Sequence, residues 1–168
     1  MKRKKTEKSK KNILKGNAKV LKARLEDAKF FWDEDLKQPL EKNLEKLQQV
    51  IYQAKLGTLY AKVERVHQLI NIFADHLKFT EQEKENAFRI NKLAKCDLVS
   101  HMVYEFPNLQ GVMGEKYARQ QGEPEIIARG IFEHYLPRHA GDVLPKSKEG
   151  AIVAIADKLE SICGCFAA

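Results

Sequence analysis

Two aspartates, Asp97 and Asp157, stand where a charged side chain is costly. Asp97 lies on the apolar stripe of a predicted helix, and Asp157 follows the apolar run AIVAIA. A buried carboxylate needs a cation or several hydrogen-bond donors. A metal ion is one such cation, and the candidate ligands are His67, Cys96, Asp97 and Asp157, with His134 nearby. A thiolate with an imidazole suits zinc better than magnesium or manganese.

The spacing of these residues resembles the signature of the HD superfamily, whose histidines and aspartates hold a divalent metal that activates water for phosphohydrolysis. Asp97 and Asp157 stand at the aspartate positions. Cys96 replaces the histidine of the His-Asp pair, and Lys62 stands where the first-helix histidine is expected. His67 is five residues beyond Lys62, which is roughly 140° around a helix of 3.6 residues per turn.

A protonated lysine cannot bind a metal ion, but it can neutralise carboxylates. We therefore predict a degenerate site of Lys62, Cys96, Asp97 and Asp157, in which Lys62 is a built-in cation for both aspartates. In this interpretation no residue is catalytic and no metal is bound. The alternative is a metal-dependent HD-type phosphohydrolase that uses His67, Cys96, Asp97 and Asp157 as ligands. Hydrolysis of a simple phosphodiester with added manganese would distinguish the two.

Apolar residues with helical spacing run through most of the chain. We predict helices over residues 12–36, 39–57, 58–77, 80–106, 123–136 and 148–168. A further short helix contains Gly111 and Gly114, where small residues allow close packing. Thr58 is an expected N-cap, and Thr80 with Glu83 forms a capping-box pattern. No stretch alternates long enough to predict a strand, so the predicted fold is an all-α helical bundle.

Charge is distributed unevenly along the chain. Residues 1–11 hold seven basic side chains and one acidic, a net of +6, while the remaining residues hold 23 basic and 22 acidic. We predict a basic disordered tail over 1–11, native or artificially added, a helical extension over 12–57, and a degenerate HD-like domain over 58–168. The last helix is still apolar at its end, so this domain is expected to be truncated at its C-terminus, with exposed Leu159, Ile162 and Phe166.

Several functions are disfavoured by the sequence. The cysteines Cys96, Cys163 and Cys165 form no CxxC pair, which favours reduced thiols in a cytoplasmic protein. No apolar run approaches the roughly 18 residues that a membrane span needs. The chain also has no P-loop, GxGxxG or Ser-His-Asp pattern, so we expect no ATP site within it.

Several stretches resemble, in order, the beta subunit of bacterial glycyl-tRNA synthetase: GNAKVLKARLEDAKFFWDEDLK, LGTLYAKVERV, AKCDLVSHMVYEFPNLQGVMGEKYA, EHYLPRHAGDVLP and AIADKLESICGCFAA. The resemblance implies an internal piece of a longer chain, within a glycine–tRNA ligase whose alpha subunit uses ATP and Mg to activate glycine. This piece would be non-catalytic and without a cofactor. Its implied partners are tRNA(Gly), the alpha subunit and the remaining beta-subunit domains, and no membrane. A purely structural spacer is the further alternative.

Two sets of residues could contact RNA. Arg138 and His139 lie beside Tyr135 between two predicted helices, where they could grip a phosphate and stack on an unpaired base. Alternatively, Tyr135 packs in the core and Arg138 pairs with Asp142. The second set shares one face of the first predicted helix, which is otherwise a solvated basic face: Lys15, Lys19 and Lys22.

Overall fold

The computed structural model describes residues 7–167, with side chains from Lys10 onward. The α-helices are α1 (Glu7–Asp35), α2 (Asn43–Lys46), α3 (Leu59–His76), α4 (Glu81–Ala94), α5 (His101–Glu105), α6 (Val112–Gln120), α7 (Glu125–Glu133) and α8 (Lys148–Ala167). Single 3-10 turns occupy Leu40–Lys42, Leu47–Gln49, Cys96–Val99 and Pro107–Leu109. The all-α prediction is confirmed, whereas the likeness of the core to the HD fold stays a prediction.

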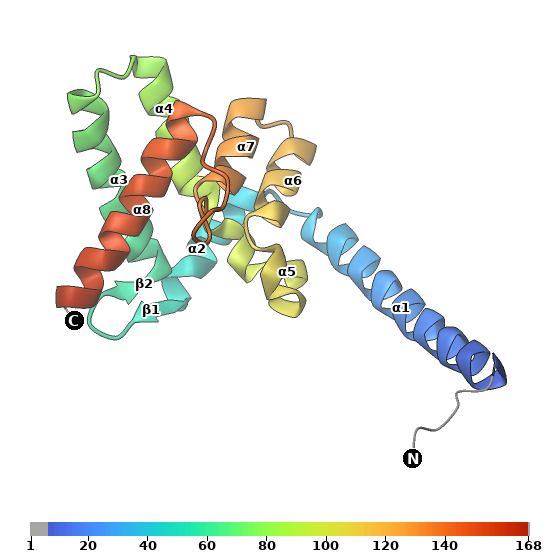
Figure 1. The fold of residues 1–168 in the computed structure, drawn as a ribbon. Helices are drawn as coiled ribbons and strands as arrows, with labels where there is room; N and C mark the ends of the chain where they lie inside the picture. The colour runs from blue at the N-terminus through green and yellow to red at the C-terminus, as the bar shows by residue number, and fades with distance from the viewer. Residues whose placement is uncertain (1–6, 168) are drawn as a thin grey trace.

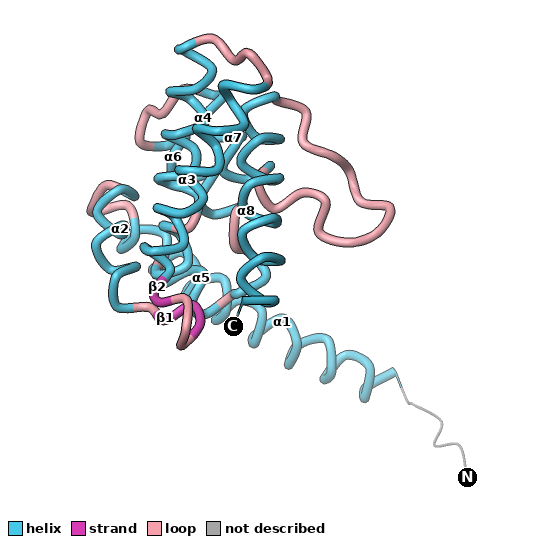
Figure 2. The backbone as a smooth tube through the Cα atoms, turned by 90° about the vertical axis from the view of Figure 1, so that its left-hand side faces the viewer, coloured by secondary structure: helices cyan, strands magenta, loops and turns pink. Residues whose placement is uncertain are grey.

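Helices α3, α4, α7 and α8 pack together into the body of the molecule, and α6 lies against α7 (Figure 1). Figure 2 shows the same bundle from the side, with α1 leading away from it. Apolar side chains that are at most 2% exposed fill the interior: Val66, Ile70, Ile90, Leu93, Ile131, Ile152 and Val153. The body therefore has one contiguous core, which positions the polar groups described below.

The starts of α3 and α4 follow the predicted capping signals. Thr58 Oγ1 accepts a hydrogen bond from the Ala61 N–H at 3.2 Å, at the first turn of α3. At α4, Thr80 Oγ1 accepts from the Glu83 N–H while the Glu83 carboxylate accepts from the Thr80 N–H. Both N-caps are confirmed. They could be predicted because such hydrogen bonds join residues within one helical turn.

The predicted helix over 80–106 is wrong beyond Ala94. Helix α4 ends at Ala94 with Lys95 as its C-cap, a 3-10 turn follows, and α5 begins at His101. Ser100 adopts an extended backbone and its Oγ accepts from the Val103 N–H at 3.2 Å, which makes it the N-cap of α5. The break places Asp97 in the 3-10 turn after α4. Its cause is this local cap together with the long-range contacts of Asp97.

The predicted helix over 39–57 is also wrong in its second half. Short helical turns reach Gln49, and strands β1 (Ile51–Gln53) and β2 (Gly57–Thr58) then form an antiparallel hairpin. Gln53 Oε1 accepts from the Lys55 and Leu56 N–H groups at 2.7 and 3.0 Å, which stabilises the turn. Gly57 has a φ of +86°, a conformation that other residues rarely adopt.

Helix α8 lies in the bundle, although it is not surrounded by it. Ile152, Val153 and Ala156 are buried, whereas Ile155 is 57% exposed, although the run AIVAIA is apolar throughout. Further along α8 the predicted exposed residues are confirmed: Leu159, Ile162 and Phe166 are 38, 56 and 90% exposed. Over the described residues, the structure has no helix that meets the length and hydropathy of a membrane span.

Helix α1 begins at Glu7, so residues 7–11, assigned to a disordered tail, are helical; residues 1–6 of that tail lie outside the described residues. The C-terminal end of α1 is fixed to the body. The Asp35 carboxylate accepts from the His101 and Met102 N–H groups at 2.9 and 3.0 Å, and from the Tyr117 hydroxyl at 2.7 Å. Asp35 therefore caps the start of α5 from a distance.

Candidate functional site

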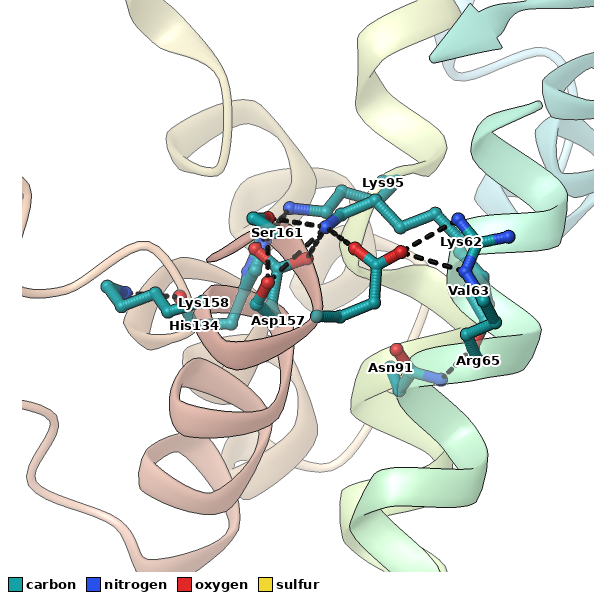
Figure 3. A network of polar contacts seen from close by, with 10 residues as sticks. Lys62, Val63, Arg65, Asn91, Lys95, His134, Asp157, Lys158 and Ser161 are labelled. Atoms are coloured by element: carbon teal, nitrogen blue, oxygen red, sulfur yellow. Dashed lines mark hydrogen bonds and ion pairs between the residues drawn. The ribbon is translucent and has the colours of Figure 1, made fainter. Parts of the chain in front are cut away.

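The polar interior of the molecule centres on Lys62, which is 3% exposed on α3. Its ammonium group contacts the Glu160 carboxylate, lies 3.4 Å from Asp157 Oδ1 and donates to Ser161 Oγ at 2.7 Å. Figure 3 shows both Lys62 and Lys95 reaching toward Asp157 on α8. Of the two aspartates assigned to Lys62 from sequence, the structure thus places Asp157 beside it.

Glu160 is a partner of Lys62 that sequence reasoning missed. It is 6% exposed, and its Oε1 also accepts from Arg65 Nε at 2.8 Å. Arg65 in turn donates to the Leu56 carbonyl at 2.9 Å, which ties the hairpin to α3 and α8. A signal for Glu160 existed, because it follows Asp157 by three residues and so shares its face of the helix.

Lys95 is a second internal cation that was not foreseen. Its Nζ lies 3.2 Å from Asp157 Oδ2 and 2.9 Å from His134 Nε2, and 4.5 Å from the centre of the Tyr135 ring. His134 Nδ1 lies 2.5 Å from the Ile131 carbonyl, which assigns the proton to Nδ1 and leaves Nε2 to accept from Lys95. The neutral imidazole therefore acts as a fixed acceptor for the ammonium group.

The electrostatics of this cluster follow from burial and from the charges within it. Burial lowers the pKa of Lys95, opposed by the charge of Asp157. Burial and the Lys95 charge together hold the pKa of His134 well below its ordinary value. For Asp157, burial acts to raise the pKa, but the charges of Lys95 and Lys62 outweigh it and the pKa is lowered. Asp157 is thus an ionised carboxylate between two ammonium groups.

Asp97 is bound by backbone N–H groups and not by a lysine, so its predicted pairing with Lys62 is wrong. Its Oδ2 accepts from the Gly111 and Gly114 N–H groups at 2.6 and 3.0 Å. Burial raises the pKa of this carboxyl to about 6, against the effect of both backbone donors. Among the described residues, Oδ1 has no hydrogen-bond partner. Asp97 therefore joins the turn after α4 to the start of α6.

The two glycines that hold Asp97 have the close packing expected from sequence. A Cβ atom on Gly114 would lie 2.7 Å from the Ile131 side chain and 3.2 Å from Asp97 Oδ2. A Cβ atom on Gly111, whose φ is +78°, would lie 2.5 Å from the Tyr135 ring. Side chains at these positions would displace the carboxylate or the ring.

The alternative metal ligands are not brought together. The Cys96 thiol donates to the Lys92 carbonyl at 3.3 Å, and burial raises its pKa to about 12. His67 is exposed, and its ring stacks on Phe88 with centroids 4.0 Å apart. Across residues 7–167, no group of three or more histidine, cysteine or acidic side chains is placed to hold a metal ion. These residues do not fit the metal that the HD resemblance implies.

Arg138 lies on the exposed loop after α7. Its guanidinium donates to the Gln110 carbonyl at 3.2 Å and lies 5.2 and 5.8 Å from the centres of the Phe132 and Tyr135 rings. Asp142 accepts from the Arg138 backbone N–H at 2.8 Å, so the expected Arg138–Asp142 contact runs through the backbone. Tyr135 is half-buried, and His139 and the second candidate set are exposed: Lys15, Lys19 and Lys22.

Comparison with known proteins identifies the family. Residues 2–168 match the family described as glycyl-tRNA synthetase beta subunit. Glycine–tRNA ligase beta subunits of Trichodesmium erythraeum and Desulforamulus reducens are 51 and 50% identical to the chain, over 90 and 92% of its length. That of Clostridioides difficile is 51% identical over 93% of the chain. The chain spans only 21–22% of the length of these relatives. The chain belongs to the glycyl-tRNA synthetase beta subunit family.

Proposed function

We propose that this chain is a non-catalytic part of the beta subunit of a glycine–tRNA ligase, where it helps to bind tRNA(Gly) and holds neighbouring domains in place. The observation that carries the proposal is the match of residues 2–168 to the family, at about half identity to named beta subunits. In the whole enzyme, ATP, Mg and glycine are handled by the alpha subunit. This part of the beta subunit contributes no cofactor site of its own.

The buried ion network supports a scaffolding role over phosphohydrolysis. Lys62 and Lys95 occupy the positions beside Asp157 and Glu160 that a metal ion would need, and Asp97 is bound to backbone N–H groups. These contacts use the polar side chains to join α3, α4 and α8. A network whose charges are satisfied internally rigidifies a fold and leaves no group free to activate water.

The loop that carries Arg138 is the favoured contact for tRNA. The guanidinium is exposed, yet the Phe132 and Tyr135 rings and the Gln110 carbonyl hold it in one orientation. A pre-organised guanidinium loses little freedom when it binds a phosphate, and its planar face can also stack on a base. His139 follows directly on the same exposed loop.

Substitution of Arg138 in the full-length enzyme tests this role. Arg138→Ala should raise the KM for tRNA(Gly) roughly tenfold, about the 1.4 kcal/mol of a lost phosphate contact, and leave glycine activation by ATP unchanged. Arg119→Ala is the matched control, because Arg119 is also exposed but is paired with Glu115 and Glu125. If the Arg138→Ala enzyme had the same KM for tRNA(Gly) as the parent, the proposed contact between this loop and tRNA would be contradicted.

A further inference from the structure

Six of the apolar residues of α1 repeat at alternating intervals of four and three. They are Leu14, Ala18, Leu21, Leu25, Ala28 and Trp32. An average spacing of about 3.5 residues keeps one face of a helix turned toward a neighbouring helix, as in coiled coils. This face is therefore suited to pack against another helix, whereas RNA is bound chiefly through charged and polar side chains.

The chain itself covers only the C-terminal end of this face. Ala28 and Trp32 pack against the core of the body, and the Trp32 ring stacks on Tyr117 with centroids 5.1 Å apart. Leu14, Leu21 and Leu25 are 66, 63 and 70% exposed, on the stretch of α1 that leads away from the body in Figure 1. We call the uncovered part the α1 seam: Leu14, Ala18, Leu21 and Leu25.

Both sides of the α1 seam are basic. Lys15, Lys22 and Lys29 line one side. Arg24 lies on the other side, with its guanidinium 4.8 Å from the centre of the Phe106 ring. Residues 10–25 include no acidic side chain. Side chains that flank a helix–helix seam select partners of opposite charge, so the helix that covers the α1 seam should carry acidic side chains beside its own apolar stripe.

The same charges disfavour a second copy of this chain as the occupant. Antiparallel pairing would set lysines such as Lys15 and Lys22 of one copy beside lysines of the other. Parallel pairing would set Arg24 beside Lys29. The ion pairs that Lys22 and Lys29 make within α1, with Glu26 at 3.7 Å and Asp33 at 2.5 Å, are solvent-exposed and offset little of this repulsion.

We propose that the α1 seam is covered by an acidic amphipathic helix of the same beta-subunit polypeptide, outside the residues of this chain. The named relatives are nearly five times as long as the matched segment, which spans 21–22% of them, so most of such a polypeptide lies elsewhere. The seam also continues a face that the chain already buries through Ala28 and Trp32. A partner on the same polypeptide has a high effective concentration, so a short seam suffices to hold it.

Hydrogen–deuterium exchange in the full-length beta subunit tests this proposal, without alpha subunit or tRNA. Amides of residues 10–25 should exchange at least about tenfold more slowly than in a Leu21→Asp variant, which places a charge in the seam. Lys15→Glu with Lys22→Glu should also speed exchange, because these charges would face the acidic partner. Lys19→Glu is the matched control, since Lys19 lies farther around α1 from the seam than Lys15 and Lys22 and should change exchange less. Slow amides in α3 and α4 verify that each variant is folded.

The proposal takes the chain as part of the beta subunit, and its test is independent of RNA binding. Fast exchange of residues 10–25 in the parent beta subunit would overturn it. Protection that appears only with the alpha subunit, only with tRNA, or in proportion to beta-subunit concentration would also overturn it, because the occupant would then be a different molecule. Equal effects of Lys19→Glu and the Lys15/Lys22 pair would contradict the seam, because exchange would then follow the overall charge of α1 and not contacts beside the seam.

Discussion

The sequence places both Asp157 and Asp97 on apolar helix faces, but Asp97 is fully buried and Asp157 is half-buried, and the partners that compensate their charges differ. Asp157 lies between the ammonium groups of Lys62 and Lys95, and its pKa is lowered. Asp97 is held by the Gly111 and Gly114 N–H groups, and its pKa is raised to about 6. Full charges compensate for the burial of a carboxylate, whereas two backbone dipoles do so only partly.

The largest expected effect comes from removing a cation on the Asp157 side. Lys62→Met leaves Glu160 and Asp157 short of a positive charge in the interior, so the free energy of unfolding should fall by about 3–5 kcal/mol. Urea unfolding of this chain measures the change. Lys116→Met, at an exposed position on α6, should have little effect. A Lys62→Met protein that unfolds at the same urea concentration as the parent would contradict the role of Lys62 as the cation for Asp157 and Glu160.

The dependence of stability on pH distinguishes the two aspartates directly. The folded-state pKa of Asp97 is above its unfolded value of 3.8, so Asp97 makes the free energy of unfolding fall as pH rises from about 4 to about 6. Asp97→Asn should abolish this fall, of roughly 1–3 kcal/mol.

Asp157 has the opposite sign. Its folded-state pKa lies below 3.8, so its contribution is present above that pH and is lost as pH falls through the lowered pKa. Asp157→Asn should therefore lower stability at neutral pH and leave the slope between pH values of about 4 and 6 in place. Equal slopes for the parent and Asp97→Asn proteins would show that Asp97 titrates normally.

The two glycines whose N–H groups bind Asp97, Gly111 and Gly114, should tolerate no side chain. Gly114→Ala places a methyl group against Ile131 and Asp97, and should destabilise the fold by about 1–3 kcal/mol. Gly16 is the matched control, because nothing lies within 4 Å of a Cβ built there, and Gly16→Ala should stabilise α1 by about 0.5–1 kcal/mol. Thermal melting of both variants provides the measurement. An unchanged melting temperature for Gly114→Ala would mean that Ile131 and Asp97 can move aside at no cost in stability.

The smallest expected effect is on phosphodiester hydrolysis. Because Lys62 and Lys95 engage Asp157 while His67 lies on the surface, manganese, magnesium or zinc should not produce hydrolysis of a simple phosphodiester by this chain. The Asp157→Asn protein is the control, and it should match the parent at background. Metal-dependent turnover that Asp157→Asn abolishes would revive the phosphohydrolase interpretation.

Local patterns predicted much of the fold. Thr58, Thr80 and Glu83 act through bonds of a single helical turn, and the stripe containing Val66 and Ile70 has only to match helical spacing. The break after Ala94 was missed because apolar spacing continues across it. The hairpin was missed because it depends on one side chain, Gln53, supporting a short turn.

The candidate site was predicted only in part. Lys62 and Asp157 were assigned to each other, and they lie 3.4 Å apart between α3 and α8. Lys95 was not assigned, because its partners His134 and Asp157 lie 39 and 62 residues away in the sequence. The glycine N–H groups that hold Asp97 come from a loop whose place depends on the packing of α6 and α7. Contacts between distant elements of this kind leave no local pattern.

The claim that the chain supplies its own cations to its buried acids is tested most directly by a double-mutant cycle on Lys95 and Asp157. The unfolding free energies of Lys95→Met, Asp157→Asn and the double variant would be compared with that of the parent. We expect a coupling energy of about 1–3 kcal/mol, with the double variant more stable than the sum of the single losses predicts. Additive losses, within about 0.5 kcal/mol, would contradict the account, because the two groups would then act independently.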